Sequence, residues 1–269
     1  MLRFMLLLAL SIPAGERVVL VNGFALVNAY LNHSGPFLFF IDTGATSSAV
    51  SPAAARHAGV RPDHRVALSA AGGDRIVPAA AGASIRIGQS SADQVELLIL
   101  SLDTLRAVDP RIQGIIGQNF LSRFPCLLDY RERRLWLGEE AVRRAENLPD
   151  RISAETAAGR IVVPVTIESG KPLRLVLDSG ASDLTLSCGD RCPPLVTSEH
   201  DGQLHSNTGS RDVRRGILPA IQVGAIRILR PKVALLERAP TASEDGLLPA
   251  HLFAAIYLAP GRNEIRLVR

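Results

Sequence analysis

Lysine and aromatic residues are scarce in this chain of 269 residues. Only Lys171 and Lys232 are lysines among 30 basic residues, and Phe, Tyr and Trp together make up 4% of the sequence. The arginines that supply most of the positive charge are scattered, and no aromatic side chains alternate with them to stack on bases. We therefore expect a solvated basic surface and no nucleic-acid partner.

Long apolar runs are missing beyond the extreme N-terminus, so the sequence predicts no internal membrane span. Residues 1–16 are the exception, because they contain an apolar run. Arg3 precedes the apolar run from Phe4 to Ile12, and Pro-Ala-Gly follows it, which is the layout of a short secretory signal. No A-x-A sequence precedes Glu16, so an uncleaved anchor or a first strand stay open as alternatives. We expect an exported protein, periplasmic or secreted.

Cysteine is rare, with three in the chain. Cys188 and Cys192 lie in the loop CGDRCPP, where a disulfide is geometrically possible in an oxidising compartment. Cys126 lies in an apolar run and is expected to be a buried thiol. These cysteines and the dispersed histidines form no metal-ligand pattern, so we expect no metal site and no other cofactor.

Glycine (22) and proline (17) are plentiful, and 47% of the residues are hydrophobic. This composition favours many turns between aliphatic strands, with a sizeable core. Short helices are expected only near residues 52–56, in residues 118–124 and in one linker. The sequence predicts an all-β protein.

The chain repeats itself once at long period, and two aspartate motifs mark the repeat. Residues 37–45 (FLFFIDTGA) correspond to residues 173–181 (LRLVLDSGA), and each copy is an apolar strand that runs into Asp-(Thr/Ser)-Gly-Ala. The repeat predicts two similar β lobes packed across a cleft. Their expected bounds are 17–138 and 160–269, with a linker over 139–159.

Two aspartate turns in register carry more weight than one, because a single Asp-Thr-Gly occurs by chance. In each copy a strand delivers a carboxylate, Asp42 or Asp178, to a sharp turn. Gly44 and Gly180 let the backbone fold back and offer its N–H groups to that carboxylate. Around a pseudo-twofold axis the two aspartates would share one proton and act as acid and base, and Thr43 and Ser179 would hold the two loops together.

At these residues the chain resembles the aspartic protease superfamily, and specifically the retropepsin-like bacterial proteins that carry two lobes in one chain. The two Asp-(Thr/Ser)-Gly-Ala sequences match the catalytic motif of that superfamily, and Ile115-Ile116-Gly117 matches its second motif. The resemblance implies an aspartic endopeptidase that hydrolyses a peptide or protein substrate by a water activated between Asp42 and Asp178. Because one chain supplies both aspartates, the active site does not require a dimer.

The resemblance also implies two substrate-binding flaps. The expected flap tips are Gly72-Gly73 and Thr208-Gly209, which lie in polar clusters at matching distances from their aspartates. Neither tip carries the tyrosine that pepsin-like enzymes use.

Two further departures from the pattern bear on activity. Pro249 replaces the glycine of the second motif in the C-terminal lobe, so a catalytically inactive peptide-binding envelope protein stays open as the alternative. Ala45 and Ala181 stand where acid-active relatives have Ser or Thr, so fewer donors stabilise the ionised dyad and a weakly acidic to neutral optimum is expected.

Overall fold

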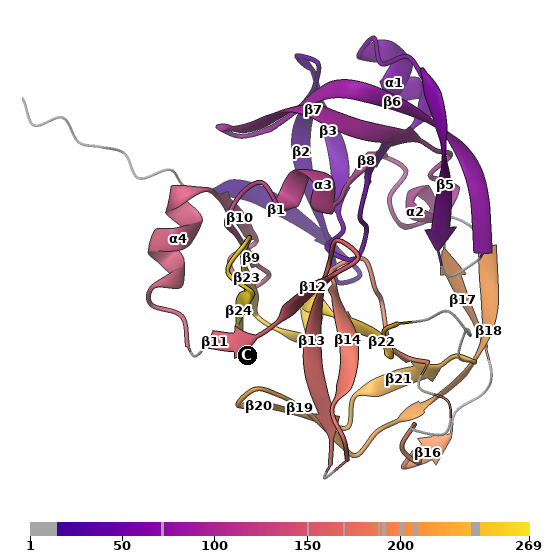
Figure 1. Cartoon of the computed structure of the whole chain (residues 1–269), viewed down its shortest axis with the longest axis vertical. Helices are drawn as coiled ribbons and strands as arrows, with labels where there is room; N and C mark the ends of the chain where they lie inside the picture. Colours follow the sequence, from indigo (N-terminus) through magenta and orange to yellow (C-terminus); the bar gives the residue numbers. More distant parts are fainter. Residues whose placement is uncertain are drawn as a thin grey trace, which may run out of the picture.

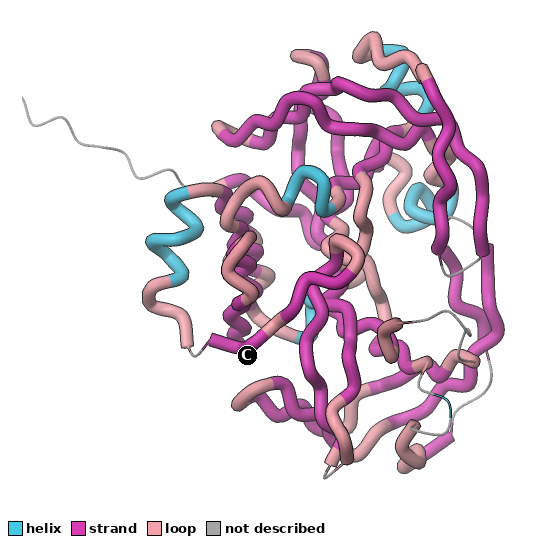
Figure 2. Tube along the Cα trace, in the orientation of Figure 1, coloured by secondary structure: helices cyan, strands magenta, loops and turns pink. Residues whose placement is uncertain are grey.

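The computed structural model describes residues 15–70, 73–149, 151–168, 170–187, 189, 192–198, 202–206, 209–237 and 243–269. Strands dominate these residues, with a few short helices between them, which confirms the predicted all-β class (Figure 2). The strands form two large sheets (Figure 1).

The larger sheet has 13 strands and contains most of the N-terminal half. In the order of their pairing they are β11 (Arg151–Ser153), β24 (Glu264–Val268), β23 (Ala255–Ala259), β9 (Cys126–Asp129), β10 (Arg134–Leu137), β1 (Glu16–Val21), β2 (Phe24–Leu31), β3 (Ser34–Ile41), β8 (Ile112–Ile116), β4 (Ser48–Val50), β7 (Ser90–Ile99), β6 (Gly73–Ile87) and β5 (His64–Ala70).

The second sheet has 11 strands and contains most of the C-terminal half. Nine of them follow one path, and β12 and β17 pair with β13 and β18 beside it. The path is β16 (Thr197–Ser198), β18 (Gly209–Ile217), β21 (Lys232–Leu235), β15 (Leu184–Leu186), β22 (Gly246–Pro249), β14 (Leu173–Asp178), β13 (Arg160–Ile167), β19 (Ala220–Val223) and β20 (Ile226–Leu229); the branches are β12 (Glu155–Ala157) and β17 (Gly202–Ser206).

The sequence repeat is reproduced in the strand connections. In the N-terminal half β3 pairs in parallel with β8, and β4 pairs in parallel with β7 and antiparallel with β8. In the C-terminal half β14, β22, β15 and β21 repeat the same three pairings. The predicted architecture of two similar β lobes is therefore confirmed.

The helices are short. They are α1 (Pro52–His57), α2 (Asp103–Val108), α3 (Gln118–Leu121), α4 (Glu139–Ala145) and the 3-10 turn η2 (Ala250–Leu252). At the start of α1 the Ser51 hydroxyl accepts the Ala54 N–H at 3.2 Å, and Pro52 fits the first turn because it needs no donor there. The sequence predicted α1, α3 and α4. It did not predict α2, which has no side-chain cap.

The last hairpin of the chain crosses to the other half. β23 pairs with β9, so β1, β10 and β9 from the N-terminal half form one continuous set of strands with β23, β24 and β11 from the C-terminal half. The bounds predicted for the two lobes do not include this exchange, and they stay a prediction as limits of folding units.

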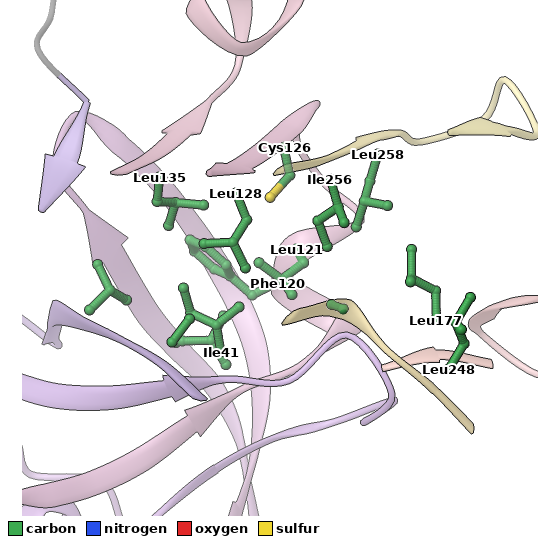
Figure 3. Close-up of a cluster of buried hydrophobic side chains, with 14 of the residues drawn as sticks. Ile41, Phe120, Leu121, Cys126, Leu128, Leu135, Leu177, Leu248, Ile256 and Leu258 are labelled. Carbon is green, nitrogen blue, oxygen red and sulfur yellow. The ribbon is translucent and has the colours of Figure 1, made fainter. Parts of the chain in front are cut away.

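The core lies behind the two aspartate-bearing strands. Figure 3 shows Ile41 beside Phe120, and Leu177 beside Leu248, with side chains of the crossing strands above them. Ile41, Leu177 and Leu248 are fully buried. Because each of them adjoins a residue of the aspartate turns or their support, the core fixes the ends of these strands.

The predictions for the cysteines, the N-terminal segment and membrane spans can also be compared with the structure. Cys126 is free and buried, and burial raises the pKa of its thiol to about 12. Cys192 is disulfide-bonded, and Cys188 lies outside the described residues. The signal-like residues 1–14 also lie outside them, and β1 begins at Glu16. Within the described part of the chain, no helix is long and apolar enough to span a membrane.

Candidate active site

The two strands β3 and β14 deliver Asp42 and Asp178. Asp42 follows the last residue of β3, and its N–H donates to the Ile116 carbonyl of β8 at 2.9 Å. Asp178 is the last residue of β14 and lies opposite Pro249 of β22 in the parallel register. Each aspartate is thus held at the end of a strand that is hydrogen-bonded on one side to the second motif of its own lobe.

Backbone N–H groups of each turn point at the carboxylate that opens it. Gly44 and Ala45 donate to Oδ1 of Asp42 at 3.0 and 2.9 Å. Gly180 donates to Oδ1 of Asp178 at 2.7 Å. These bonds orient the carboxyl groups and favour their ionised form.

The hydroxyls of Thr43 and Ser179 connect the two turns across the pseudo-twofold axis. Thr43 Oγ1 donates to the Leu177 carbonyl at 2.7 Å and accepts the Ser179 N–H at 2.9 Å. Ser179 Oγ donates to the Ile41 carbonyl at 2.8 Å and accepts the Thr43 N–H at 3.0 Å. Both side chains are buried, at 1% and 0% exposed. The four bonds fix the position of one turn against the other.

Each glycine of the turns faces the carboxyl group of the opposite lobe. A Cβ on Gly44 would lie 2.5 Å from Cγ of Asp178, and a Cβ on Gly180 would lie 2.8 Å from Cγ of Asp42. Any side chain at either position would displace the opposing carboxyl group. The structure therefore brings Asp42, Asp178 and the four residues that follow them into one compact cluster.

Burial raises the pKa of both carboxyl groups. Asp178 is 8% exposed, and the nearby charge of Asp42 raises its pKa further. A hydrogen bond between the two carboxyl groups lowers the pKa of Asp42 and raises that of Asp178, and the Ala45 N–H also lowers that of Asp42. The pKa of each carboxyl group is thus raised, more strongly for Asp178, and the two titrate as a coupled pair.

The second motif supports the N-terminal turn closely. Gly117 lies against the backbone of Ser47, where a Cβ would come within 2.6 Å, and its N–H donates to Oγ of Ser48 at 3.0 Å. Gln118 Nε2 donates to the Thr43 carbonyl at 2.8 Å. Gln118 was not predicted from the sequence, where its one signal is its place directly after the motif glycine.

In the C-terminal lobe both the donor and the acceptor of the corresponding hydrogen bond are absent. Pro249 has no N–H to donate, and Leu184, which follows Asp178 as Ser48 follows Asp42, has no oxygen to accept one. Ala250 stands where the first lobe has Gln118. β22 nevertheless keeps its parallel register with β14 up to Asp178. The proline therefore removes a donor at a place where its lobe offers no acceptor.

Two hairpins lie at the predicted flap positions. β5 and β6 form one, with Gly73 at its tip (φ +113°), and β17 and β18 form the other, with Gly209 at its tip (φ +147°). Glycine is favoured at both tips because L side chains rarely adopt a positive φ. The hairpins extend toward each other along one side of the view (Figure 1). Gly72 and Thr208 lie outside the described residues.

Among the described residues, no group of three or more His, Cys, Asp or Glu side chains is placed to hold a metal ion. Asp183, the carboxylate nearest in sequence to the second turn, is engaged by Arg215 Nη1 at 3.0 Å. It braces the base of the β17–β18 hairpin and is not part of the cluster around Asp42 and Asp178.

Comparison with protein families agrees with this geometry. A family model described as "gag-polyprotein putative aspartyl protease" matches residues 27–123, and a model described as "Aspartyl protease" matches residues 163–251. The two matches contain Asp42 and Asp178 respectively, and together they span well over half of the chain. No curated protein matches the sequence. The chain belongs to the retropepsin-like aspartic protease superfamily.

Proposed function

We propose that this protein is an aspartic endopeptidase that hydrolyses peptide bonds with a water activated between Asp42 and Asp178. The observation that supports it most is the reciprocal approach of the two turns, in which Gly44 adjoins the Asp178 carboxyl group and Gly180 adjoins that of Asp42. Two carboxyl groups that form a hydrogen bond with each other cannot both ionise easily, so they hold one proton between them.

The asymmetry of the pair assigns the two roles. Both carboxyl groups have two backbone donors, Gly44 and Ala45 for Asp42 and Gly180 and Ala181 for Asp178, so the hydrogen bond between the carboxyl groups distinguishes them. Asp42 accepts this bond and is the base. Asp178 keeps the proton and is the acid. Asp42 takes a proton from the water as its oxygen attacks the peptide carbonyl carbon, and Asp178 gives its proton to the carbonyl oxygen.

The tetrahedral diol then collapses with the roles reversed. Asp42 returns its proton to the leaving nitrogen, the C–N bond breaks, and Asp178 recovers a proton from one hydroxyl of the diol. A carboxylic acid and an amine leave, and the dyad is back in its starting protonation state. The bonds of Thr43 and Ser179 keep the two carboxyl groups in register through both steps.

The test is cleavage of a fluorogenic peptide library by the wild type, Asp42→Asn and Asp178→Asn across pH. We expect each variant to lose activity by roughly 10²- to 10⁴-fold, because an amide can neither take up nor share the proton. Asp129→Asn is the matched control, since this carboxylate accepts the Glu132 N–H in the turn between β9 and β10 and lies outside the two aspartate turns. The activity of this variant should stay at wild-type level.

Circular dichroism would establish that both dyad variants keep the fold. A wild type that binds peptides but leaves them intact would support the inactive peptide-binding alternative, and wild-type activity in either dyad variant would show that the assignment is wrong.

A further inference from the structure

The two lobes differ in chemistry on the face that carries the aspartates. In the N-terminal lobe this face is formed by apolar residues. Phe24 of β2 packs on Phe40 of β3, with ring centroids 5.2 Å apart. Leu38 and Ile112 join the same cluster. Phe40 lies two residues before Asp42, so its side chain points to the same side of the sheet as the dyad.

In the C-terminal lobe charged residues occupy the corresponding positions. Arg160 precedes Asp178 by 18 positions, as Phe24 precedes Asp42, and Arg174 precedes it by four, as Leu38 precedes Asp42. Glu244 lies two residues before Gly246, as Ile112 lies two residues before Gly114. Three apolar positions of one lobe are thus two arginines and a glutamate in the other.

The strand register places Arg160 on the dyad side of its sheet. Val162 of β13 lies opposite Val176 of β14. Arg160 lies two residues before Val162, and Asp178 lies two residues after Val176. Because side chains alternate along a strand, these four share one face, and Arg160 lies at its end, next to the catalytic turn.

An ion pair holds Arg160 in place. Its Nη2 donates to Oε2 of Glu244 at 3.0 Å. The Glu244 side chain is 10% exposed and that of Arg160 is 29% exposed, so Arg160 is the more exposed member of the pair. Among the described residues this is the single hydrogen bond that its five N–H groups make, and its buried Nε has no partner there.

The neighbouring carboxylates Glu155 and Asp245 are already engaged, and Oε1 of Glu244 is buried without a partner among the described residues. Glu155 accepts both Nε and Nη2 of Arg174. Asp245 is 2% exposed and accepts the backbone N–H of Arg174 at 3.0 Å. Nε of Arg160 is buried, so the donors left for a ligand among the described residues are those of its two Nη groups that Glu244 does not use, and the group that complements them is an acceptor with two oxygens.

We propose that Arg160 is a specificity-determining residue that binds the carboxylate of an acidic substrate side chain on the C-terminal-lobe side of the scissile bond. The apolar face at Phe24 and Leu38, which are both partly exposed, takes an uncharged side chain on the other side. This inference rests on the proposed peptidase function and adds the class of peptide that the site selects.

Two readouts with a peptide library of randomised sequence test it. The first is the sequence around each bond that the wild type cleaves, read by mass spectrometry. The second is retention of peptides on immobilised Asp178→Asn protein, which needs no turnover. We expect Asp or Glu to be enriched at one position in both readouts. A glutamate peptide should be preferred to its glutamine analogue by roughly tenfold or more, the scale of a charge-assisted hydrogen bond.

The variant is the double substitution Arg160→Met and Glu244→Met, which leaves no buried charge unpaired and copies the apolar character of the first lobe. It should bring the Glu/Gln ratio close to one while uncharged peptides are still cleaved. The control is Arg151→Met with Glu264→Met, a pair 3.1 Å apart on β11 and β24, which should keep the wild-type ratio.

The outcomes separate the two claims. Equal use of Glu and Gln peptides by the wild type, or an acid preference that survives in the Arg160/Glu244 variant, would overturn this inference, whereas cleavage in the same assay would still uphold the peptidase. Selective retention of acidic peptides with no cleavage by the wild type would uphold the binding role of Arg160 and overturn the peptidase.

Discussion

At the scale of single residues, the pKa values of the dyad depend first on the burial of the two carboxyl groups and then on the donors around them, among which are the N–H groups of Ala45 and Ala181. Ala45 gives Asp42 a backbone N–H at 2.9 Å, and the Ala181 N–H also lowers the pKa of Asp178, but neither has a hydroxyl to add. Burial raises the pKa of both carboxyl groups against these donors. The state with one shared proton therefore persists to higher pH than it would in a pair of carboxyl groups that accepted additional hydrogen bonds from hydroxyl groups.

The number of donors to the dyad predicts the direction of a pH shift. We expect kcat/KM to be highest at weakly acidic to neutral pH. Activity falls at low pH, where the ionised carboxylate takes up a proton, and at high pH, where the shared proton is lost above the raised pKa. Ala45→Ser and Ala181→Ser add a donor to the ionised form, lower the pKa of the pair and move both limbs of the profile toward acid. A kcat/KM profile from about pH 3 to 8 measures it, and a serine variant shifted toward alkali would contradict the argument.

The internal repeat explains which of these residues the sequence alone could identify. Asp42, Asp178 and the four turn residues occur twice in register, so their role could be predicted from the sequence. Gln118 and Arg160 could not be, because the other copy has Ala250 and Phe24 in their places. A residue that differs between the two lobes is not supported by a matching residue in the other copy of the repeat, so only the contacts of the folded chain indicate its role.

At the scale of strands and turns, the support beneath each aspartate is built differently in the two lobes. Ser48 of β4 accepts the Gly117 N–H at 3.0 Å and donates to Asn119 Oδ1 at 2.7 Å, and it is fully buried. In the other lobe Pro249 and Leu184 need no such bond. From the sequence alone Pro249 looks like a defect in the second motif. The compensating change, Leu184 in place of the serine acceptor, lies 65 residues away and was not connected with it.

Ser48→Ala should therefore destabilise the protein. It leaves the buried Gly117 N–H without an acceptor, which costs roughly 1–3 kcal/mol of unfolding free energy. We expect a lower midpoint in urea unfolding and a reduced kcat, since Gly117 lies against the turn that carries Asp42.

Thr185→Ala, at a buried hydroxyl of the other lobe that donates only a long bond of 3.2 Å to the Asp183 carbonyl, is the comparison and should cost less. Equal midpoints for Ser48→Ala and wild type would mean that the hydrogen bond adds nothing to stability.

At the scale of the whole molecule, the exchange of the last hairpin joins the two lobes. β23 pairs with β9 over four residues, and Ile256 and Leu258 are buried between the halves. The sequence could not reveal this, because β23–β24 closes the second copy with the same strand–turn–strand pattern that β9–β10 gives the first. Either partner suits the pattern, and only tertiary pairing decides between them.

The shared strands predict that the halves unfold together. Ile256→Ala removes a fully buried side chain of the C-terminal half and should cost about 2–5 kcal/mol. Trp136, the one tryptophan of the chain, lies in β10 of the N-terminal half and packs in one cluster with Leu127 and Tyr257, so its fluorescence reports on both sides of the shared strands. In Ile256→Ala we expect the urea transition of the Trp136 fluorescence to shift to lower concentration and to coincide with the transition seen by circular dichroism.

Val223→Ala, in β19 far along the other sheet, is the control for a change confined to the C-terminal lobe, and it too should move the Trp136 transition if the two lobes form one cooperative unit. A Trp136 transition that stays at its wild-type midpoint in both variants, while circular dichroism shows an earlier step, would establish that the lobes unfold separately and that the hairpin exchange does not couple them.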